Sequence, residues 1–409
     1  MNLFGAMRLP RTVVFGSGHR ASLGAMTAEI GSRALVCTDA RLSSDSQFQT
    51  ILRDLEHAGV VVHLYDRTQP DLPLESVYDC LQDCASFGAQ LVIGIGGGSC
   101  MDMAKAVALL LRHGGRAQDY YGEYKVPGPI LPVIAVPTTA GTGSEVTPVA
   151  VVSDSERNLK VGIASPHLIP VAAVCDPELT LSCPPALTAF SAGDALTHAI
   201  ESYTALARTP VPGLTQQHVF VGKNALSDQF ALLSIASIWK GLRRAYANGQ
   251  DLEARELLML GALAAGCAFG TAGTAAAHAI QYPVGALTHT AHGAGVATLL
   301  PYVMQFNKPA CERAFAQIAR AVDLPDVGGT DESLAQRLID EVAALLGSVG
   351  IPTTLRDLGL ASDKQDFTAE SALAIARLIK NNPRPLDLPA LRKITHAAYS
   401  GDRLSLQGV

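Results

Sequence analysis

The first 180 residues alternate short apolar runs with stretches of helical periodicity. The runs are rich in Val, Ile and Ala, and most are closed by Gly, Pro or Asp. Near-continuous apolar strands that alternate with helices are typical of a parallel sheet covered on both faces. The expected strands are Thr12–Phe15, Ala34–Thr38, Val60–Tyr65, Leu91–Ile95, Val133–Val136 and Val171–Val174.

The pattern changes at Pro184-Pro185, after which helical periodicity continues almost without strand runs. Proline stops the preceding element and suits the first turn of a helix, so this pair predicts a domain boundary. We expect an α/β domain with a parallel sheet over residues 1–184 and an all-α domain over residues 185–409. Residues 205–223 are expected to be irregular. The expected helices are 186–204, 224–247, 251–269, 274–286, 291–305, 308–323, 331–347, 367–380 and 388–399.

Composition excludes several classes of protein. With 409 residues, 48% hydrophobic, the chain can bury a large core, which excludes a disordered chain and a disulfide-stapled mini-protein. The net charge of −6 comes from interspersed acids and bases, so the basic footprint of a nucleic-acid-binding protein is missing.

Eight scattered cysteines without a CxxC pair indicate a reducing, cytoplasmic location. The uncharged stretch Leu257–Ile280 is long enough for a membrane span, but its glycines favour a buried helix and a turn.

A glycine-rich loop follows the expected strand Leu91–Ile95. Gly96-Gly97-Gly98-Ser99 leads into a helical segment, so backbone N–H groups and a helix N-terminus would face a bound anion. Ser99 is a candidate N-cap, with Asp102 three residues later as in a capping box. A tight turn that needs glycine only for its conformation is the alternative. Three consecutive glycines favour the close approach of a phosphate group.

Two further polar features follow expected strands. The loop 137–145 offers four hydroxyl groups and two glycines, and can line the same edge of the sheet, although an ordinary Ser/Thr-rich turn is the alternative. Asp39 ends the second strand, where a carboxylate could bind the ribose hydroxyls of adenosine and repel a 2′-phosphate, or simply cap a turn. The usual dinucleotide fingerprint fails, because Gly16-Ser17-Gly18 lacks the third glycine.

Asp194 and His198 suggest a metal site. They lie four residues apart in an apolar helix and therefore share one face. His278 and His292 follow in a segment that Pro283 interrupts, which predicts that the two histidines lie on different elements. One carboxylate with two or three imidazoles suits Fe(II) or Zn(II). Each histidine alone could be a core or surface residue, but an unpaired charge in an apolar helix would be costly to bury.

Four motifs at matching spacings resemble the iron-containing (group III) alcohol dehydrogenases. They are GGGS at 96–99 with Asp102 and Lys105, PTTAGTGSEVT at 137–147, GDALTHAIESY at 193–203 and HAIQYPVGALTHTAHG at 278–293. The resemblance runs from about residue 8 to the final helix and includes NNPRP at 381–385. It implies a fold similar to dehydroquinate synthase, in which residues 1–184 form a dinucleotide-binding domain for NAD and residues 185–409 form a metal-binding and substrate domain. The implied metal is one divalent ion, Fe(II) or alternatively Zn(II). It also implies a homodimer or higher homo-oligomer that acts on a small alcohol or aldehyde.

The resemblance also implies roles for individual residues. Asp39 matches the acid that favours NAD over NADP. Lys160 matches a lysine that lies near the nicotinamide, and Phe269 matches an aromatic residue that borders the substrate. Val149 and Leu181 match residues of the nicotinamide pocket. The implied metal ligands are Asp194, His198, His278 and His292, and the other implied cofactor contacts are Gly96, Gly97, Gly98, Ser99, Cys100, Thr138, Thr139 and Thr142.

Two positions depart from the family pattern. Many members carry a second histidine four residues after the third metal ligand, where this chain has Tyr282. That histidine is usually assigned to proton relay, so Tyr282 and His289 are both candidate catalytic residues here. Asp71 stands where the family often has Asn.

The predicted function is the metal-dependent, NAD(H)-linked interconversion of a small alcohol and its aldehyde or ketone. Hydroxyacid–oxoacid transhydrogenases of the superfamily share an HxxxYP setting, but the 14-residue spacing of His278 and His292 argues against close kinship. A lyase of the dehydroquinate synthase type would use a metal set led by Glu. A non-catalytic subunit is disfavoured because all four ligands are intact.

Overall fold

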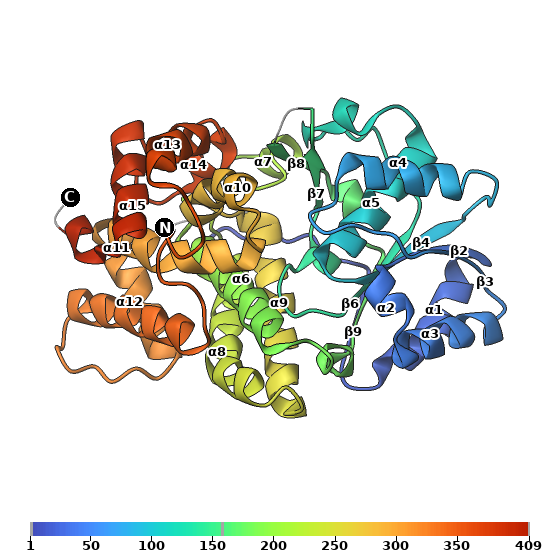
Figure 1. Ribbon diagram of the computed structural model, residues 1–409, viewed down its shortest axis with the longest axis horizontal. Helices are drawn as coiled ribbons and strands as arrows, with labels where there is room; N and C mark the ends of the chain where they lie inside the picture. The colour runs from blue at the N-terminus through green and yellow to red at the C-terminus, as the bar shows by residue number, and fades with distance from the viewer. Residues whose placement is uncertain (1–2, 157–158, 408–409) are drawn as a thin grey trace. The chain divides into compact units, whose positions relative to one another are not determined.

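Six of the apolar runs form one parallel sheet in the computed structural model, which describes residues 3–156 and 159–407 (Figure 1). The strand order is β1-β9-β6-β4-β2-β3. The predicted parallel sheet is confirmed, and each predicted strand agrees within one residue at either end. The strands are β1 (Thr12–Phe15), β2 (Arg33–Cys37), β3 (Val61–Tyr65), β4 (Leu91–Gly96), β6 (Val133–Pro137) and β9 (Ala172–Cys175).

The sheet is covered on both faces because successive side chains point to opposite sides of a strand. In β2, Leu35 and Cys37 belong to one hydrophobic core, whereas Ala34 and Val36 belong to the other. All six residues of β4 are buried, which explains its continuous apolar run. The first core is closed by α4 (Leu74–Asp83) and α5 (Gly98–His113), and the second by α1 (Leu23–Ile30) and α3 (Ser46–His57).

A second sheet was not predicted. β7 (Val149–Asp154) and β8 (Leu159–Ala164) pair antiparallel, and β5 (Gly122–Glu123) adds to β8 in parallel. A signal for β7 was present in the sequence as the apolar run Val149–Val152. In the structure the residues of β7 alternate between partly and fully buried positions.

A buried lysine ties α5 to the segment that leads into β7. Lys105 is fully buried, and its Nζ donates to Ser144 Oγ at 2.9 Å and to the carbonyls of Thr147 and Val149 at 3.0 and 2.9 Å. Asp102, one turn earlier, lies 3.9 Å from the same Nζ and accepts from Ser144 Oγ at 2.6 Å. Removing one partner of a buried ion pair typically costs about 3–5 kcal/mol. The network therefore fixes the second loop against α5.

Burial shifts the pKa values of this network in the expected directions. It lowers the pKa of Lys105 to about 8, against the opposing effects of Asp102 and Glu145. It raises the pKa of the Asp102 carboxyl, and it raises the pKa of Glu145 to about 7. Lys105 remains charged at neutral pH because the two carboxyl groups oppose its desolvation.

Beyond β9 the chain is helical, as predicted. One correction concerns α11, which continues through Pro301 and Pro309 although two helices, 291–305 and 308–323, were expected. The backbone hydrogen bond lost at Pro301 is outweighed by burial, since every residue from Ala294 to Asn307 is buried. Pro309 is exposed. The helices are α6 (Pro185–Thr204), α8 (Ala225–Ala247), α9 (Leu252–Ala272), α10 (Ala276–Thr288), α11 (His292–Ala321), α12 (Asp331–Ser348), α13 (Gln365–Leu373), α14 (Ala376–Asn381) and α15 (Leu388–Ser400).

Three smaller differences from the predicted helices follow from local geometry. The expected helix 367–380 is divided into α13 and α14 at Ile375, whose ψ of 63° is not helical. Pro283 lies inside α10 and does not interrupt it. The irregular stretch 205–223 contains one short helix. The short helices of the described chain are α2 (Ala40–Ser43), α7 (Leu214–Gln217), η1 (His19–Ser22), η2 (Ala117–Tyr120), η3 (Ser144–Val146), η4 (Pro166–Leu168), η5 (Pro177–Thr180), η6 (Ser362–Lys364) and η7 (Arg403–Leu406).

The chain divides into two compact units. The sheet unit comprises Arg8–Ser182 and Thr215–Val219, and the helical unit comprises Cys183–Leu214, the chain from Phe220 onward and the segment that ends at Met7. Within the described residues, no single helix is long and apolar enough to cross a membrane. The bent pair of α9 and α10 passes such a test by length and composition alone.

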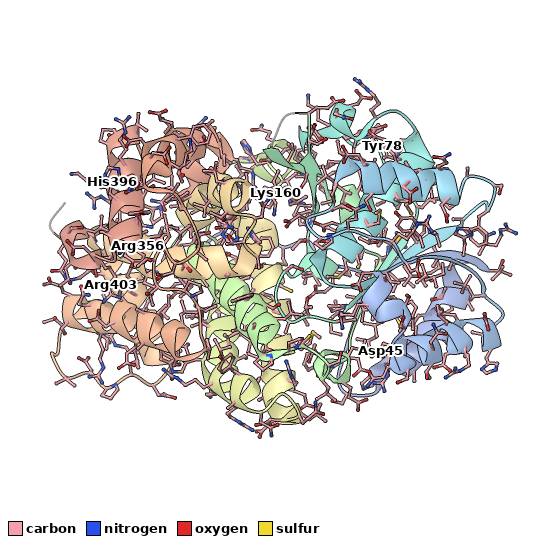
Figure 2. All side chains as sticks on the ribbon, in the orientation of Figure 1. Asp45, Tyr78, Lys160, Arg356, His396 and Arg403 are labelled. Atoms are coloured by element: carbon pink, nitrogen blue, oxygen red, sulfur yellow. The ribbon has the colours of Figure 1, made fainter. Side chains whose placement is uncertain are left out.

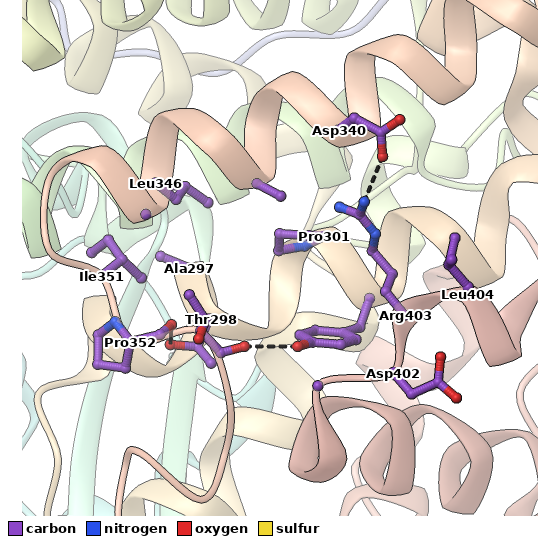
Figure 3. A pocket seen from close by; sticks show the side chains of 15 residues that line it. Ala297, Thr298, Pro301, Asp340, Leu346, Ile351, Pro352, Asp402, Arg403 and Leu404 are labelled. Atoms are coloured by element: carbon purple, nitrogen blue, oxygen red, sulfur yellow. Dashed lines mark hydrogen bonds and ion pairs between the residues drawn. The ribbon is translucent and has the colours of Figure 1, made fainter.

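The helical unit contains a pocket of about 540 Å³ between α11, α12 and η7 (Figure 3). An ion pair between Asp340 and Arg403 lies on its wall, and Tyr302 donates a hydrogen bond to the Thr353 carbonyl. The described residues that line this pocket include none of the predicted site residues.

Candidate functional site

The four predicted metal ligands converge within the helical unit. Asp194 and His198 lie one turn apart on α6, His278 lies in the first turn of α10, and His292 is the first residue of α11. Asp194 Oδ1 lies 3.6 Å from Nε2 of His198, 3.6 Å from Nε2 of His278 and 3.8 Å from Nε2 of His292. The ligand atoms of Asp194, His278 and His292 all lie within 4.8 Å of one another. His198 lies outside this group and approaches it through Asp194 Oδ1.

This arrangement fits a divalent metal ion. Asp194 Oδ1 and His278 Nε2 are buried and have no hydrogen-bond partner among the described residues. Leaving such groups unsatisfied is costly. Ligand atoms bound tetrahedrally at about 2.1 Å lie about 3.4 Å from one another. The observed spacings of 3.6–3.8 Å around Asp194 Oδ1 are close to that value and too long for hydrogen bonds.

The pKa values of these groups follow from their burial and from one another. Burial alone would raise the pKa of Asp194, but the three histidines around it hold this pKa below its usual range. Burial lowers the pKa of His198 to about 4, although Asp194 opposes the change. Burial also opposes the charging of His278, but Glu201 and Asp194 raise its pKa to about 9. The Asp194 carboxylate is thus available as an anionic ligand at neutral pH.

Stacking holds the ring of His198. Its ring centroid lies 4.1 Å from that of Phe269 and 4.6 Å from that of His278, with nearly parallel planes in both cases. Phe269 comes from α9 and is 8% exposed. The structure therefore brings Phe269, which was predicted to border the substrate, against a predicted metal ligand.

The two candidate relay residues lie at different distances from the ligands. Tyr282 follows His278 by one turn of α10, is partly buried, and has its ring centroid 6.1 Å from that of His292. His289 ends α10 in a left-handed conformation with φ of 55° and is exposed. Within the residues that the structure describes, His289 makes no hydrogen bond or ring contact with a predicted metal ligand. Tyr282 is therefore the one of the two that the structure brings to the ligands.

Glu201 is a site residue that the sequence analysis missed. It is 3% exposed on α6, and its Oε2 lies 2.6 Å from Nδ1 of His278. The same carboxylate accepts hydrogen bonds from the backbone N–H groups of Ala275 and Ala277. A spacing signal existed, because Glu201 follows Asp194 by seven residues and so lies two turns along the same helix face.

The glycine-rich loop and the second polar loop meet in the sheet unit. A Cβ added to Gly98 would lie 2.7 Å from Thr142 Cγ2, and one added to Gly97 would lie 3.6 Å from Thr139 Oγ1. At Gly96, with φ of 151°, it would lie 2.5 Å from Cys100 Sγ. Thr138 directly follows β6, the strand next to β4. Glycine is thus required at Gly98 for the close approach of the two loops, and at Gly96 for its positive φ and for the space that Cys100 takes.

The N-cap prediction for Ser99 was wrong. Helix α5 begins at Gly98 with Gly97 as its N-cap, and no side chain of the described residues caps it. Asp102, expected to complete a capping box, instead accepts from Ser144 Oγ and from the backbone N–H of Val151 at 2.9 Å. The uncapped N-terminus of α5 retains the N–H groups that would suit an anion.

Asp39 caps a helix, which was one of the two interpretations of this residue. It follows β2, and its Oδ1 accepts from the backbone N–H of Leu42 at 2.9 Å as the N-cap of α2. Its other oxygen, Oδ2, lies 3.9 Å from the thiol of Cys100, at the start of α5. The carboxylate therefore lies beside the glycine-rich loop, and its capping role does not occupy Oδ2.

The remaining predicted cofactor residues lie around the smaller sheet and η5. Val149 begins β7, and Leu181 directly follows η5. Lys160, on β8, forms an ion pair with Asp71 at 2.6 Å (Figure 2). Asp71 has a left-handed φ of 60°. Replacing the usual Asn by Asp at this position thus gives Lys160 a charged partner.

Comparisons with known proteins agree with this geometry. The family described as "Iron-containing alcohol dehydrogenase" matches residues 10–177, and "Fe-containing alcohol dehydrogenase family, C-terminal" matches residues 188–399. Long-chain-alcohol dehydrogenase 1 of Geobacillus thermodenitrificans is 36% identical over 90% of this chain and 89% of its own length. NAD-dependent methanol dehydrogenase of Bacillus methanolicus is 33% identical over 92% of this chain and 95% of its own length. The crystal structure of a 1,3-propanediol oxidoreductase superposes with a TM-score of 0.90 at 31% identity, covering 97% of this chain and all of that one.

We expect His198→Ala to abolish tight metal binding, because it removes one of the proposed ligand nitrogens. The shorter side chain leaves a small cavity in the helical unit, and we expect the protein to remain folded. The measurement is metal content per chain by elemental analysis after dialysis, with circular dichroism as the check on folding. His396→Ala, an exposed histidine of α15 in the same unit (Figure 2), is the matched control and should retain its metal. Stoichiometric metal in the His198 variant would contradict the assignment.

Proposed function

Because the chain belongs to the iron-containing alcohol dehydrogenase family, we propose that Asp194, His198, His278 and His292 together bind one divalent ion, Fe(II) or alternatively Zn(II). Membership makes the chain an NAD-linked oxidoreductase of alcohols and aldehydes. The observation that carries the ligand assignment is the approach of three imidazole nitrogens to the buried Oδ1 of Asp194, which has no hydrogen-bond partner among the described residues. When bound, the metal supplies a Lewis acid for the substrate oxygen and NAD accepts the hydride.

The chain's own residues orient the substrate in this proposal. Phe269 and the ring of His198 form one apolar stack beside the ligands, so the carbon chain of a small alcohol would lie against Phe269. Burial of Asp194 and His278 to about 3% exposure keeps bulk water away from the ligand atoms. Electrostatic interactions strengthen where water is excluded.

We assign the cofactor to the sheet unit. The pyrophosphate is proposed to bind at Gly96–Ser99 and the start of α5, whose N-terminal N–H groups are uncapped. Cys100, Thr139 and Thr142 border this loop, and the backbone N–H of Thr138 donates to the Gly96 carbonyl at 3.0 Å. Thr138 is proposed as a further cofactor contact, and Val149, Lys160 and Leu181 are proposed to line the nicotinamide pocket. The proximity of Gly97 to Thr139 and of Gly98 to Thr142 supports a joint cradle formed by both loops.

We also propose that the enzyme is a cytoplasmic homodimer or higher homo-oligomer. All eight cysteines lie in the described part of the chain as buried free thiols, which supports a reducing location. β1 is an edge strand with Val13 39% exposed, and an edge of this kind can pair with a second copy.

The activity is tested by incubating the metal-reconstituted protein with a series of small alcohols and NAD. We expect one NADH for each aldehyde or ketone formed, and metal-stripped protein is the matched control. A transhydrogenase would instead retain its cofactor and require a second carbonyl substrate. Product formation that depends on such a substrate, with no net NADH, would overturn the proposal.

Asp39 is expected to set the preference for NAD. Its Oδ2 would repel a 2′-phosphate, and a preference of about 10–100-fold in kcat/KM corresponds to about 1.4–2.7 kcal/mol. Asp39→Ser removes the charge but can still cap α2, so the preference should narrow or reverse while thermal stability changes little. Asp45→Ser makes the same substitution at the N-cap of α3 and is the matched control, which should keep the wild-type preference for NAD. Equal use of both cofactors by the wild type would exclude this role.

The proton relay is proposed to involve His289 or Tyr282. Tyr282 lies beside His292, whereas His289 is exposed and ends α10 in a left-handed conformation. We therefore expect Tyr282→Phe to lower kcat on the order of 10²-fold and to change its pH profile, and His289→Ala to change kcat less. The comparison uses kcat measured from pH 5 to 10. If both variants keep the wild-type rate and profile, the proton leaves by another path.

A further inference from the structure

We propose that Glu201 is a positioning residue that couples the start of α10 to the orientation of His278 for metal binding. The inference rests on the proposed metal centre and adds a residue that is not a ligand. A carboxylate that is 3% exposed needs partners for both oxygens. The described partners of the Glu201 carboxylate are Ala275, Ala277 and His278, at the start of α10.

The two oxygens divide three donors between them. Oε2 accepts from the backbone N–H of Ala275 at 2.8 Å and contacts Nδ1 of His278 at 2.6 Å, and Oε1 accepts from the backbone N–H of Ala277 at 2.7 Å. An ionised carboxylate can only accept, so Nδ1 of His278 must carry the hydrogen. In the neutral imidazole the lone pair is then on Nε2, the atom that faces Asp194 Oδ1.

Glu201 also replaces a cap that α10 lacks. The N-cap residue is Ala275, which has no side-chain acceptor, although the first N–H groups of a helix need one. Glu201 supplies both the acceptor and a negative charge at the positive end of the helix dipole. The position of the helix start and the orientation of His278 are therefore set by the same carboxylate.

Helix α6 supplies two of the four proposed ligands and orients a third. Asp194 and His198 are on α6, and Glu201, on the same face, holds the third ligand from α10. A carboxylate bonded to the second nitrogen of a metal-bound histidine fixes the tautomer and ring orientation. Losing such a partner typically weakens metal binding by about 10–100-fold.

Glu201→Gln is the informative substitution because glutamine keeps the volume but has a single acceptor oxygen. Three donors cannot all be satisfied, since the amide NH₂ must face either Ala277 N–H or the donors on Oε2. We expect the dissociation constant of Co(II) to rise about 10–100-fold in the variant. We also expect a changed visible spectrum of bound Co(II), because the His278 ring is less restrained. The constant is measured by chelator competition on metal-stripped protein.

A second substitution separates the capping role from the positioning role. Ala275→Ser places a hydroxyl at the N-cap, where it can accept from Ala277 N–H, one of the donors that glutamine can leave unpaired. In the Glu201→Gln background we expect Ala275→Ser to recover thermal stability of the metal-free protein but not Co(II) affinity. Recovery of wild-type affinity would show that Glu201 acts only through the helix start, and would overturn the proposal.

Two further variants complete the test. Thr204→Val removes a buried hydroxyl that bonds to the Ile200 carbonyl on the same helix, and should leave Co(II) affinity unchanged. His198→Ala tests the metal centre itself. If His198→Ala and Glu201→Gln both bind Co(II) as the wild type does, the metal centre is wrong. If only Glu201→Gln retains wild-type affinity, the centre stands and the positioning role of Glu201 is excluded.

Discussion

A carboxylate cannot be withdrawn from water without compensation, and Asp194 is the buried carboxylate around which the helical unit is organised. It lies at 3% exposure in the middle of a 20-residue apolar helix. Three imidazole nitrogens surround its Oδ1 at 3.6–3.8 Å and leave space for a cation that would compensate the charge, which requires α10 and α11 to begin beside the same turn of α6. The fold of this unit therefore depends on electrostatic demand at one oxygen as well as on the burial of apolar side chains.

The larger sheet could be predicted from sequence because its strands are buried on both faces. β4, for example, is wholly buried and reads as an uninterrupted apolar run. The hairpin of β7 and β8 was missed because its apolar residues are followed or interrupted by polar ones such as Ser153 and Lys160. Helix α11 was divided in error at residues 306–307, because local propensity does not include the packing that buries Phe306 and Asn307 and keeps the helix continuous.

The candidate site shows the same division between local and long-range information. Asp194 and His198 could be recognised from their spacing along one helix. The role of Glu201 could not, because its partner His278 is 77 residues away and the backbone donors at Ala275 and Ala277 carry no sequence signal. Ser99 was wrongly chosen as a cap because Asp102, its expected capping partner, is committed to Ser144 and the backbone of β7.

The buried network of Lys105 has a consequence for how the glycine-rich loop meets a phosphate. Lys105 and Asp102 fasten α5 to Ser144 and to the backbone that enters β7, so the two loops are held together by groups that water does not reach. Conformational entropy of these loops is thus lost when the chain folds, and little remains to be lost when a ligand arrives. A glycine-rich segment, the most flexible kind of backbone in an unfolded chain, here serves as a rigid receptor.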